Sequence, residues 1–247
     1  MISLSPLEIA YCAVVLVVSY ALRGSTGFGG FAAMPLMALV VPMKILVPVW
    51  TLLTIVSSTA IVGSDRPNVC VPDLLRMAPG CIVGIAIGLY FFKTLDAQML
   101  ARAFGAIVLV YAVYSLWAMR RAPPRWQLDS RAIAAIAGTL GGVFGTVFGT
   151  MASIFFAVYL DAQRAAKDHF RATISAMLLI LSVVRGIGYY AVGEFDLETL
   201  ILFAAAFVPM LIGIFIGDRI HARLDQNNFK RLVCGILIVS AISLLAK

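Results

Sequence analysis

The sequence predicts an all-α membrane protein, a polytopic transmembrane helical bundle of about 8–10 segments. Of its 247 residues, 62% are hydrophobic and only 13% are charged, and the mean hydropathy is +1.00. A soluble domain has roughly 45–50% apolar and about 25% charged residues, so this chain has too few polar side chains to cover a surface in water. The bilayer must therefore be the solvent for most of that surface. This excludes a soluble enzyme, a disordered chain and a secreted disulfide scaffold.

Ten apolar segments follow one another along the chain. A full helical crossing needs roughly 17–25 residues, and the first, second, sixth and seventh segments are shorter. Glycine-rich breaks at 24–30 and 141–149 separate the members of each short pair. No segment alternates apolar and polar residues, so a transmembrane barrel is not expected. The segments cover residues 7–22, 28–42, 45–63, 74–92, 99–118, 132–148, 149–160, 171–191, 198–217 and 232–246.

The two halves of the sequence resemble each other. Within 84–102, seven of the 19 residues recur 129 positions later, including Gly84 as Gly213. Composition alone predicts roughly one or two such identities. Because five segments per half is an odd number, the second copy enters the membrane from the opposite side, which gives two inverted-topology repeats with broken or short helices. The expected organisation is a first repeat over 1–119, a basic linker loop over 120–131 and a second repeat over 132–247.

The positive charges of the predicted loops set the orientation. In a ten-crossing arrangement, thirteen Lys and Arg side chains fall on one side of the membrane and four on the other. Cytoplasmic loops are enriched in Lys and Arg, so both termini are expected on the opposite, outer side. The same rule explains the net charge of +7 without a nucleic-acid partner. The first eight residues hold no Lys or Arg, so we expect the first apolar run to stay in the membrane rather than to be a cleaved signal peptide.

The glycine-rich breaks predict an anion site. Discontinuous helices at matching positions of two halves are typical of transporter binding sites. A helix N-terminus inside the membrane favours negative charge, because its free N–H groups and its dipole face the ligand. Glycines let a ligand approach the backbone, and Ser and Thr add hydroxyl donors. The residues expected to bind substrate at the breaks are Ser25, Thr26, Gly27, Gly29, Gly30, Gly145, Thr146, Gly149 and Thr150.

Close packing of helices is the alternative role for such glycines. Small residues at four-residue spacing allow transmembrane helices to approach closely. For the ladder formed by Gly80, Gly84 and Gly88 we favour packing, whereas for the breaks we favour binding.

Two arginines interrupt the apolar segments. Arg185 lies in the middle of one segment, and Arg23 ends another immediately before the first break. A charge inside the membrane is costly and indicates a functional site, although either side chain could instead snorkel to an interface. All twelve Asp and Glu residues lie in loops or near segment ends, so we expect no carboxylate to pair with these arginines. Arg23 and Arg185 are thus expected to provide the counter-charge for an anion.

No pattern of catalytic or metal-ligating residues points to an enzyme. Both histidines, His169 and His221, fall in polar loops, and the motifs of zinc proteases, nucleophile-elbow hydrolases and phosphate-loop ATPases are missing. The four cysteines have no CxxC spacing and are expected to be buried free thiols. We expect no catalytic residues, cofactor, metal or nucleic-acid partner. The expected partners are the lipid bilayer and a small anionic substrate, with a homo-oligomer left open.

Motifs in both halves carry a resemblance to a known family. The first half has Gly27-Phe-Gly-Gly30 followed by Pro35-Leu36, and a second stretch of interest is Phe170-Arg-Ala-Thr173. With the size and the duplication, these motifs resemble the sulfite exporter TauE/SafE family over nearly the whole chain. The second half keeps Gly145 and Gly149 of the repeated signature. It departs from it at Thr150-Met151, where a glycine pair is usual, and at Phe155, where proline is usual.

The resemblance implies a multi-pass permease or exporter of the bacterial inner membrane, with both termini in the periplasm. Sulfite, thiosulfate and organic sulfonates are the family range of small anions, and the implied fold is an inverted-repeat helical bundle that works by alternating access. An anion channel and a non-transporting membrane subunit or sensor are the alternatives. The departures in the second half leave open which anion is carried.

Overall fold

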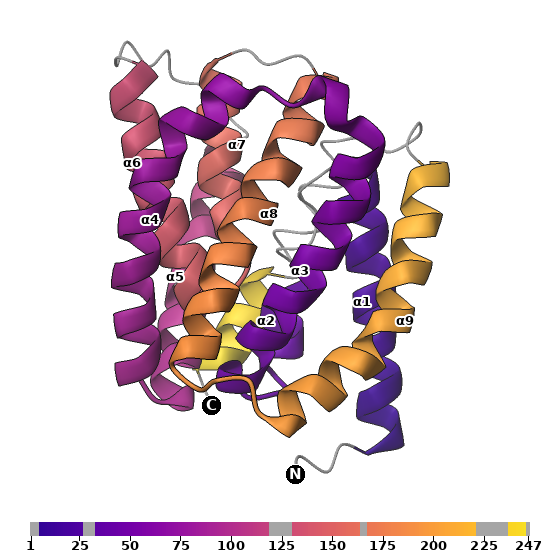
Figure 1. Cartoon of the computed structure of the whole chain (residues 1–247). Coiled ribbons are helices and arrows are strands. Elements are labelled where there is room, and N and C mark those ends of the chain that lie inside the picture. Colours follow the sequence, from indigo (N-terminus) through magenta and orange to yellow (C-terminus); the bar gives the residue numbers. More distant parts are fainter. Residues whose placement is uncertain (1–4, 27–32, 119–129, 164–166, 221–236, 246–247) are drawn as a thin grey trace.

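The computed structural model describes residues 5–26, 33–118, 130–163, 167–220 and 237–245, and the regular structure in these ranges is helical (Figure 1). The predicted all-α bundle is therefore confirmed. Seven of the described helices are long and apolar enough to cross a membrane. They are α1 (Pro6–Thr26), α3 (Met43–Asp65), α4 (Val71–Thr94), α5 (Ala97–Ala118), α6 (Ser130–Phe148), α8 (Lys167–Ala191) and α9 (Leu197–Ile220).

Shorter helices complete the described bundle: α2 (Ala33–Met37), α7 (Ala152–Ala162) and a helix over 237–245. At 1.5 Å per residue, α2 is about 8 Å long and α7 about 16 Å, so neither can cross a hydrocarbon core of about 30 Å. Each of the ten predicted segments overlaps one of these ten helices. Of the four segments expected to be short, the second and seventh form the short helices α2 and α7, whereas the first and sixth form α1 and α6, which are long enough to cross.

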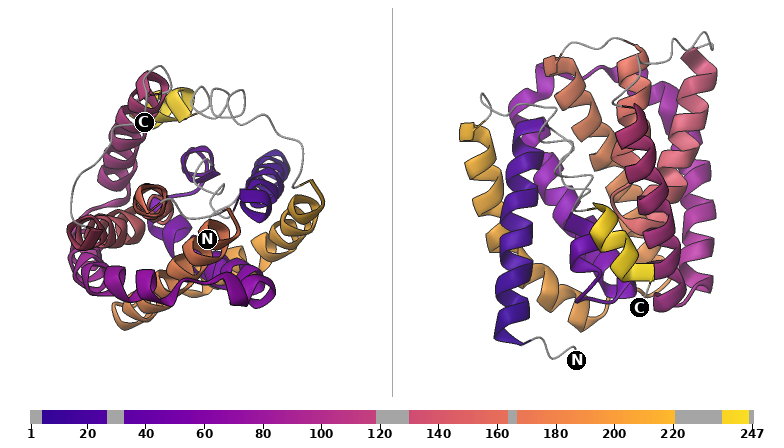
Figure 2. Two further views of the ribbon diagram at one scale, coloured as in Figure 1. Left: turned by 90° about the horizontal axis from the view of Figure 1, so that it is seen from above. Right: turned by 180° about the vertical axis from the view of Figure 1, so that it is seen from behind.

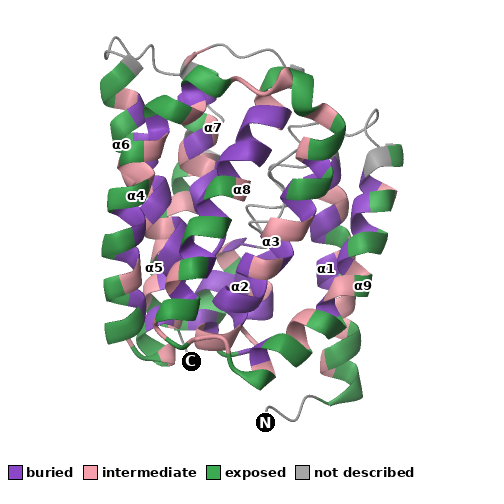
Figure 3. Cartoon of the chain, in the orientation of Figure 1, coloured by how far each residue is buried: buried purple, intermediate pink, exposed green. Residues whose placement is uncertain are grey.

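Two helices form the centre of the bundle. The membrane-spanning windows of α3 and α8 are the most buried of the seven, and these helices pack against each other. The outer faces of α4 and α9 expose large apolar side chains such as Ile82, Tyr90, Val208 and Phe215. Figure 3 shows the same division, with buried residues along α8 and α2 and exposed residues on α4 and α9. The exposed apolar faces are those that lipid would cover.

The most extensive packing joins helices from opposite halves of the chain. Helix α4 runs along α6, and α1 runs along α9 (Figures 1 and 2). A Cβ atom on Gly84 of α4 would lie 2.9 Å from both Gly142 Cα and Val143 N of α6, and one on Gly213 of α9 would lie 2.6 Å from Val17 O of α1. The packing role predicted for the Gly80–Gly88 ladder is confirmed, because only glycine permits this approach of two backbones.

The first and last described helices share one end of the bundle, as Figures 1 and 2 show. Helix α1 begins at that end and the 237–245 helix lies in that half of the molecule. The turn between α3 and α4, which contains Arg66 in a short 3₁₀ helix, lies at the opposite end.

A single carboxylate caps the N-terminus of α9. The backbone N–H of Thr199 donates to Oδ1 of Asp196 at 2.8 Å. These hydrogen bonds from Thr199 hold the pKa of Asp196 below its ordinary value of 3.8, because they favour the ionised form. The cap therefore contributes fully above about pH 4. As the pH falls through 3.8 and then through the lowered pKa of the folded state, this contribution is lost.

We expect Asp196→Ala to lower the free energy of unfolding by about 1 kcal/mol at pH 7, because an N-cap acceptor is removed. The difference should shrink as the pH falls below about 4, where the carboxylate takes up a proton first in the unfolded state and then, at lower pH, in the folded state. Thermal unfolding in detergent at pH 7 and at pH 3 measures both effects. Asp196→Asn, which keeps an acceptor oxygen, is the matched control and should lose less stability at pH 7. A difference between Asp196→Ala and wild type that is equal at both pH values would contradict the assignment.

Candidate functional site

Two buried arginines come together in the interior of the bundle. Arg23, near the end of α1, is 3% exposed, and Arg185 of α8 is 1% exposed. Both lie beside the same aromatic pair: the Arg23 guanidinium lies over the Tyr20 ring, which packs against Trp50. A Cβ on Gly149, whose carbonyl accepts from Arg185, would lie 3.7 Å from Trp50 Cδ1. In the part of the chain that the structure describes, neither arginine forms an ion pair with a carboxylate. Both side chains are therefore buried in the bundle rather than exposed at its surface.

Arg23 has few partners among the described residues. Its Nη2 donates to Ser58 Oγ of α3 at 2.7 Å, while its Nε has no hydrogen-bond partner in the described part of the chain. The guanidinium carbon lies 5.9 Å from the centroid of the Tyr20 ring, which packs 5.5 Å from the ring of Trp50. A hydroxyl and an aromatic face solvate a cation only weakly compared with water. The described residues therefore leave most of the positive charge of Arg23 uncompensated.

Arg185 is bound by the C-terminal end of α6. Its Nη1 donates to the carbonyl oxygens of Gly145 and Gly149, the second at 2.9 Å. One turn further along α8, the hydroxyl of Tyr189 donates to the carbonyl oxygen of Thr146. The last carbonyls of a helix lack partners within it, so α8 caps the end of α6. Gly149 ends the helix with a φ of +82°, a conformation that glycine adopts without strain.

The second break exposes backbone carbonyls where the sequence predicted free N–H groups. Helix α6 continues through Gly145 to Phe148, and the N–H of Gly149 donates to the carbonyl of Gly145 at 3.0 Å. The predicted N–H donors of Gly145 and Gly149 are therefore engaged in the helix, and their carbonyls contact Arg185 instead. Sequence reasoning missed this because it treated the whole of 141–149 as a break, whereas the chain leaves the helix only at 149–151.

A buried helix N-terminus does follow this break, at the start of α7. Its first residues, Ala152 and Ser153, are buried together with Thr150, and no side chain caps the helix. The first N–H groups of a helix have no intrahelical acceptors, so they can donate to an anion. The hydroxyl oxygens of Thr150 and Thr146 are buried and have no hydrogen-bond partner.

Several further buried hydroxyl groups lack partners. Burying a hydroxyl without a hydrogen bond costs about 1–3 kcal/mol, so such groups indicate a bound ligand or water. Helix α3 carries a stripe of hydroxyl side chains at Thr51, Thr54, Ser57 and Ser58, a spacing that could have been recognised in the sequence. Among the residues that the structure describes, the buried hydroxyl oxygens without a hydrogen-bond partner are those of Tyr20, Thr54, Thr146, Thr150, Ser175 and Ser182.

The first break is only partly described. Ser25 and Thr26 are the last residues of α1. Gly27, Gly29 and Gly30 lie outside the described residues.

Polar contacts between the two halves lie away from the arginines, toward the helix ends. At the α3–α4 turn, Asp65 pairs with Arg171 of α8 at 3.4 Å, and buried Asp73 accepts a hydrogen bond from the Tyr159 hydroxyl of α7 at 2.7 Å. At the start of α3, Lys44 pairs with Glu194 at 3.8 Å. These carboxylates are thus engaged elsewhere, as expected from their positions near segment ends.

The described cysteines and histidine take no part in this site. Cys12 is buried as expected, but Cys70 and Cys81 are only partly buried, and all three are free. His169 is exposed as expected but belongs to α8 rather than to a loop, and its Nδ1 lies 2.9 Å from the carbonyl oxygen of Asn68. Cys234 and His221 lie outside the described residues. Within the described ranges, no three His, Cys, Asp or Glu side chains lie together as a metal site would need.

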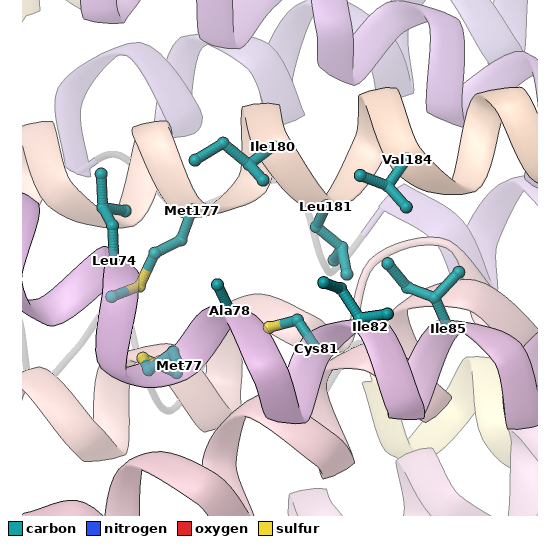
Figure 4. A pocket seen from close by; sticks show the side chains of 10 residues that line it. All are labelled: Leu74, Met77, Ala78, Cys81, Ile82, Ile85, Met177, Ile180, Leu181 and Val184. Carbon is teal, nitrogen blue, oxygen red and sulfur yellow. The ribbon is translucent and has the colours of Figure 1, made fainter.

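A second feature, an apolar groove between α4 and α8, is chemically unsuited to an anion. Its cavity volume is about 80 Å³, and it is lined by aliphatic, Met and Cys side chains, among them Met77, Ile85 and Leu181 (Figure 4). Ile82 and Val184, also in its lining, are exposed on the outer surface. The groove therefore opens toward the region where lipid chains would lie.

The fold and the central arginines define a class: a multi-pass helical membrane protein built around a buried, positively charged site. A family model described as sulfite exporter TauE/SafE matches residues 11–244. The chain belongs to this family of membrane transporters, and the resemblance seen in the sequence is confirmed. Searches of curated proteins and of solved structures gave no significant match.

Proposed function

We propose that the protein is a bacterial inner-membrane permease that moves a small sulfur-containing oxyanion or organic sulfonate by alternating access. The observation that carries the proposal is the pair of buried arginines, Arg23 and Arg185, without a carboxylate partner among the described residues. An uncompensated charge inside a membrane protein is costly unless a ligand of opposite sign occupies the site. Membership of the sulfite exporter family supports the choice of substrate.

In this proposal the two arginines provide the counter-charge, and hydroxyl groups orient the anion. The hydroxyl groups available for this are those that are buried without a partner in the described part of the chain. They are Tyr20 of α1, Thr54 of α3 and Ser182 of α8, with Thr146 and Thr150 at the α6–α7 break. Gly145 and Gly149 act through their carbonyls, which hold Arg185 in place. For the first break we keep Ser25, Thr26, Gly27, Gly29 and Gly30 as proposed substrate contacts.

An inverted repeat would supply the moving parts. The first helix of each half packs against the fourth helix of the other half: α1 on α9, and α6 on α4. A two-fold axis through the α3–α8 contact would produce this pair of contacts. This supports repeats over 1–119 and 132–247. With the basic loops in the cytoplasm, both termini would be periplasmic. Rocking of one half against the other would break the contacts at Asp65–Arg171 and at Lys44–Glu194 in turn.

The proposal predicts that Arg23→Gln lowers saturable anion flux by about tenfold or more, because a buried charge that faces the substrate is lost. The assay is uptake of labelled sulfite, thiosulfate and a small sulfonate, each tested separately, into proteoliposomes. Arg102→Gln is the matched control, since Arg102 is exposed on α5 and contacts neither arginine. Its flux should equal that of the wild type.

Three results would decide between the functions. Counterflow of labelled substrate against unlabelled substrate identifies a carrier, because a channel does not accumulate label in exchange. Flux without counterflow would replace the carrier with an anion channel. Absence of flux with every sulfur anion, from protein that is correctly folded, would contradict transport and favour a non-transporting subunit or sensor.

A further inference from the structure

We infer that the site is built for a doubly charged oxyanion held between Arg23 and Arg185, rather than for a singly charged one. The inference rests on the proposed function and specifies the charge of its substrate. Three observations support it: the balance of charge, the groups that each guanidinium leaves unpaired, and the elements from which the two arginines come.

The balance of charge favours a dianion. Both guanidinium groups are buried, and among the described residues neither pairs with a carboxylate. Arg23 contacts a neutral hydroxyl, and Arg185 contacts two carbonyls that carry only the partial negative charge of a helix C-terminus. A monoanion would leave about one positive charge buried in a medium of low dielectric constant. A dianion compensates both.

The free donors also favour a ligand with several oxygens. Both hydrogen bonds of Arg185 to α6 come from Nη1, and its Nε has no partner. The edge of a guanidinium that contains Nε is the one that binds oxyanions through two parallel hydrogen bonds. Nε of Arg23 is also unpartnered. Two such donors from separate side chains suit an oxyanion with three or four oxygens, whose negative charge is spread over them.

The two arginines come from different halves of the chain. Arg23 belongs to α1, and Arg185 belongs to α8, which is held to α6 through the carbonyls of Gly145 and Gly149. An anion that pairs with both arginines therefore joins the two halves. Without it, repulsion between the two charges opposes their approach. A ligand with two negative charges removes this repulsion, whereas a ligand with one removes it only in part.

The test compares matched anions on the purified full-length protein in nanodiscs of neutral lipid. Isothermal titration measures the affinity for sulfate and thiosulfate, which are dianions, and for methanesulfonate, a monoanion of similar tetrahedral shape. We expect the better dianion to bind at least about tenfold more tightly than methanesulfonate. Arg23→Gln and Arg185→Gln should each reduce this preference to within about threefold, because one charge is removed. Arg102→Gln should leave it unchanged.

Lysine variants keep the test informative if a glutamine variant does not fold. Arg23→Lys and Arg185→Lys keep the charge but lose the planar fork, so overall affinity should fall while the preference for the dianion remains. Equal or tighter binding of methanesulfonate by the wild type would overturn this inference and leave the proposed transport function standing. Failure of all three anions to bind, together with absence of flux, would instead overturn the proposed function.

Discussion

Replacing Arg185 by Gln is expected to abolish anion flux in proteoliposomes, with a loss of about 100-fold or more. The substitution has two effects at once. It removes one of the two buried positive charges, and it removes the guanidinium donor from two carbonyls, of which that of Gly145 keeps the N–H of Gly149. A hydrogen bond from a charged group contributes about 1.5–3 kcal/mol, and loss of the buried charge offsets part of this, so the free energy of unfolding should also fall by about 1–2 kcal/mol.

Two variants separate these effects. Arg185→Lys keeps the charge but cannot reproduce the planar guanidinium, so it should retain part of the flux. Tyr189→Phe removes only the hydrogen bond to the Thr146 carbonyl and leaves both arginines intact. It should cost about 1 kcal/mol of stability and little flux. Uptake assays together with thermal unfolding measure the two effects. Wild-type flux in Arg185→Gln would show that Arg185 serves only to cap α6, if at all.

Replacing Gly84 by Leu is expected to prevent stable assembly of the bundle. Even the first added carbon would lie 2.9 Å from Gly142 Cα and Val143 N, which are backbone atoms of α6. Backbone cannot move aside as a flexible side chain can, so α4 must separate from α6 along their contact. Overpacking in a core costs about 1–3 kcal/mol for small changes, and a leucine adds three further carbons, so we expect a loss of more than about 3 kcal/mol.

Thermal unfolding and recovery of monodisperse protein in detergent measure this effect. Gly63→Leu on α3 is the matched control, since a Cβ there would have no atom within 4 Å. It should be neutral or slightly stabilising, because leucine has the higher helix propensity. Gly213→Leu, which would press on Val17 of α1, should behave like Gly84→Leu. If Gly84→Leu were as stable as Gly63→Leu, the close contact of α4 with α6 would be wrong.

Much of the architecture could be predicted from the sequence, because membrane insertion imposes strong patterns on it. Long apolar runs of helical length correspond to α3, α4 and α9, and the short runs to α2 and α7. The buried arginines were recognisable for the same reason: a charge within an apolar run is conspicuous. Neither pattern depends on knowing which helices pack together.

The partners of the arginines could not be predicted, because they depend on tertiary packing. Glycines at 145 and 149 are compatible with a break or with a continuing transmembrane helix, and only the packing of α8 shows that α6 continues to Phe148. The hydroxyl side chains that α3 contributes to the site could be seen as a pattern in the sequence, but their role could not. Thr54, Ser57 and Ser58 lie on one helical face, but hydroxyl groups in an apolar helix also bond to their own backbone, as Thr51 does to Val47.

The packing of helices from one half against helices of the other has a consequence for biosynthesis. Helix α1 is made early, but α9, along which it packs through Gly213 and Gly217, is among the last helices to leave the ribosome. Until then α1 resides in the bilayer with its glycine-facing surface covered only by lipid or by an insertion factor. Neither half can complete its own interior, so synthesis of 1–119 alone should yield a product that cellular quality control degrades. Co-expression of the two halves as separate chains should protect both halves from degradation, because each completes the interior of the other.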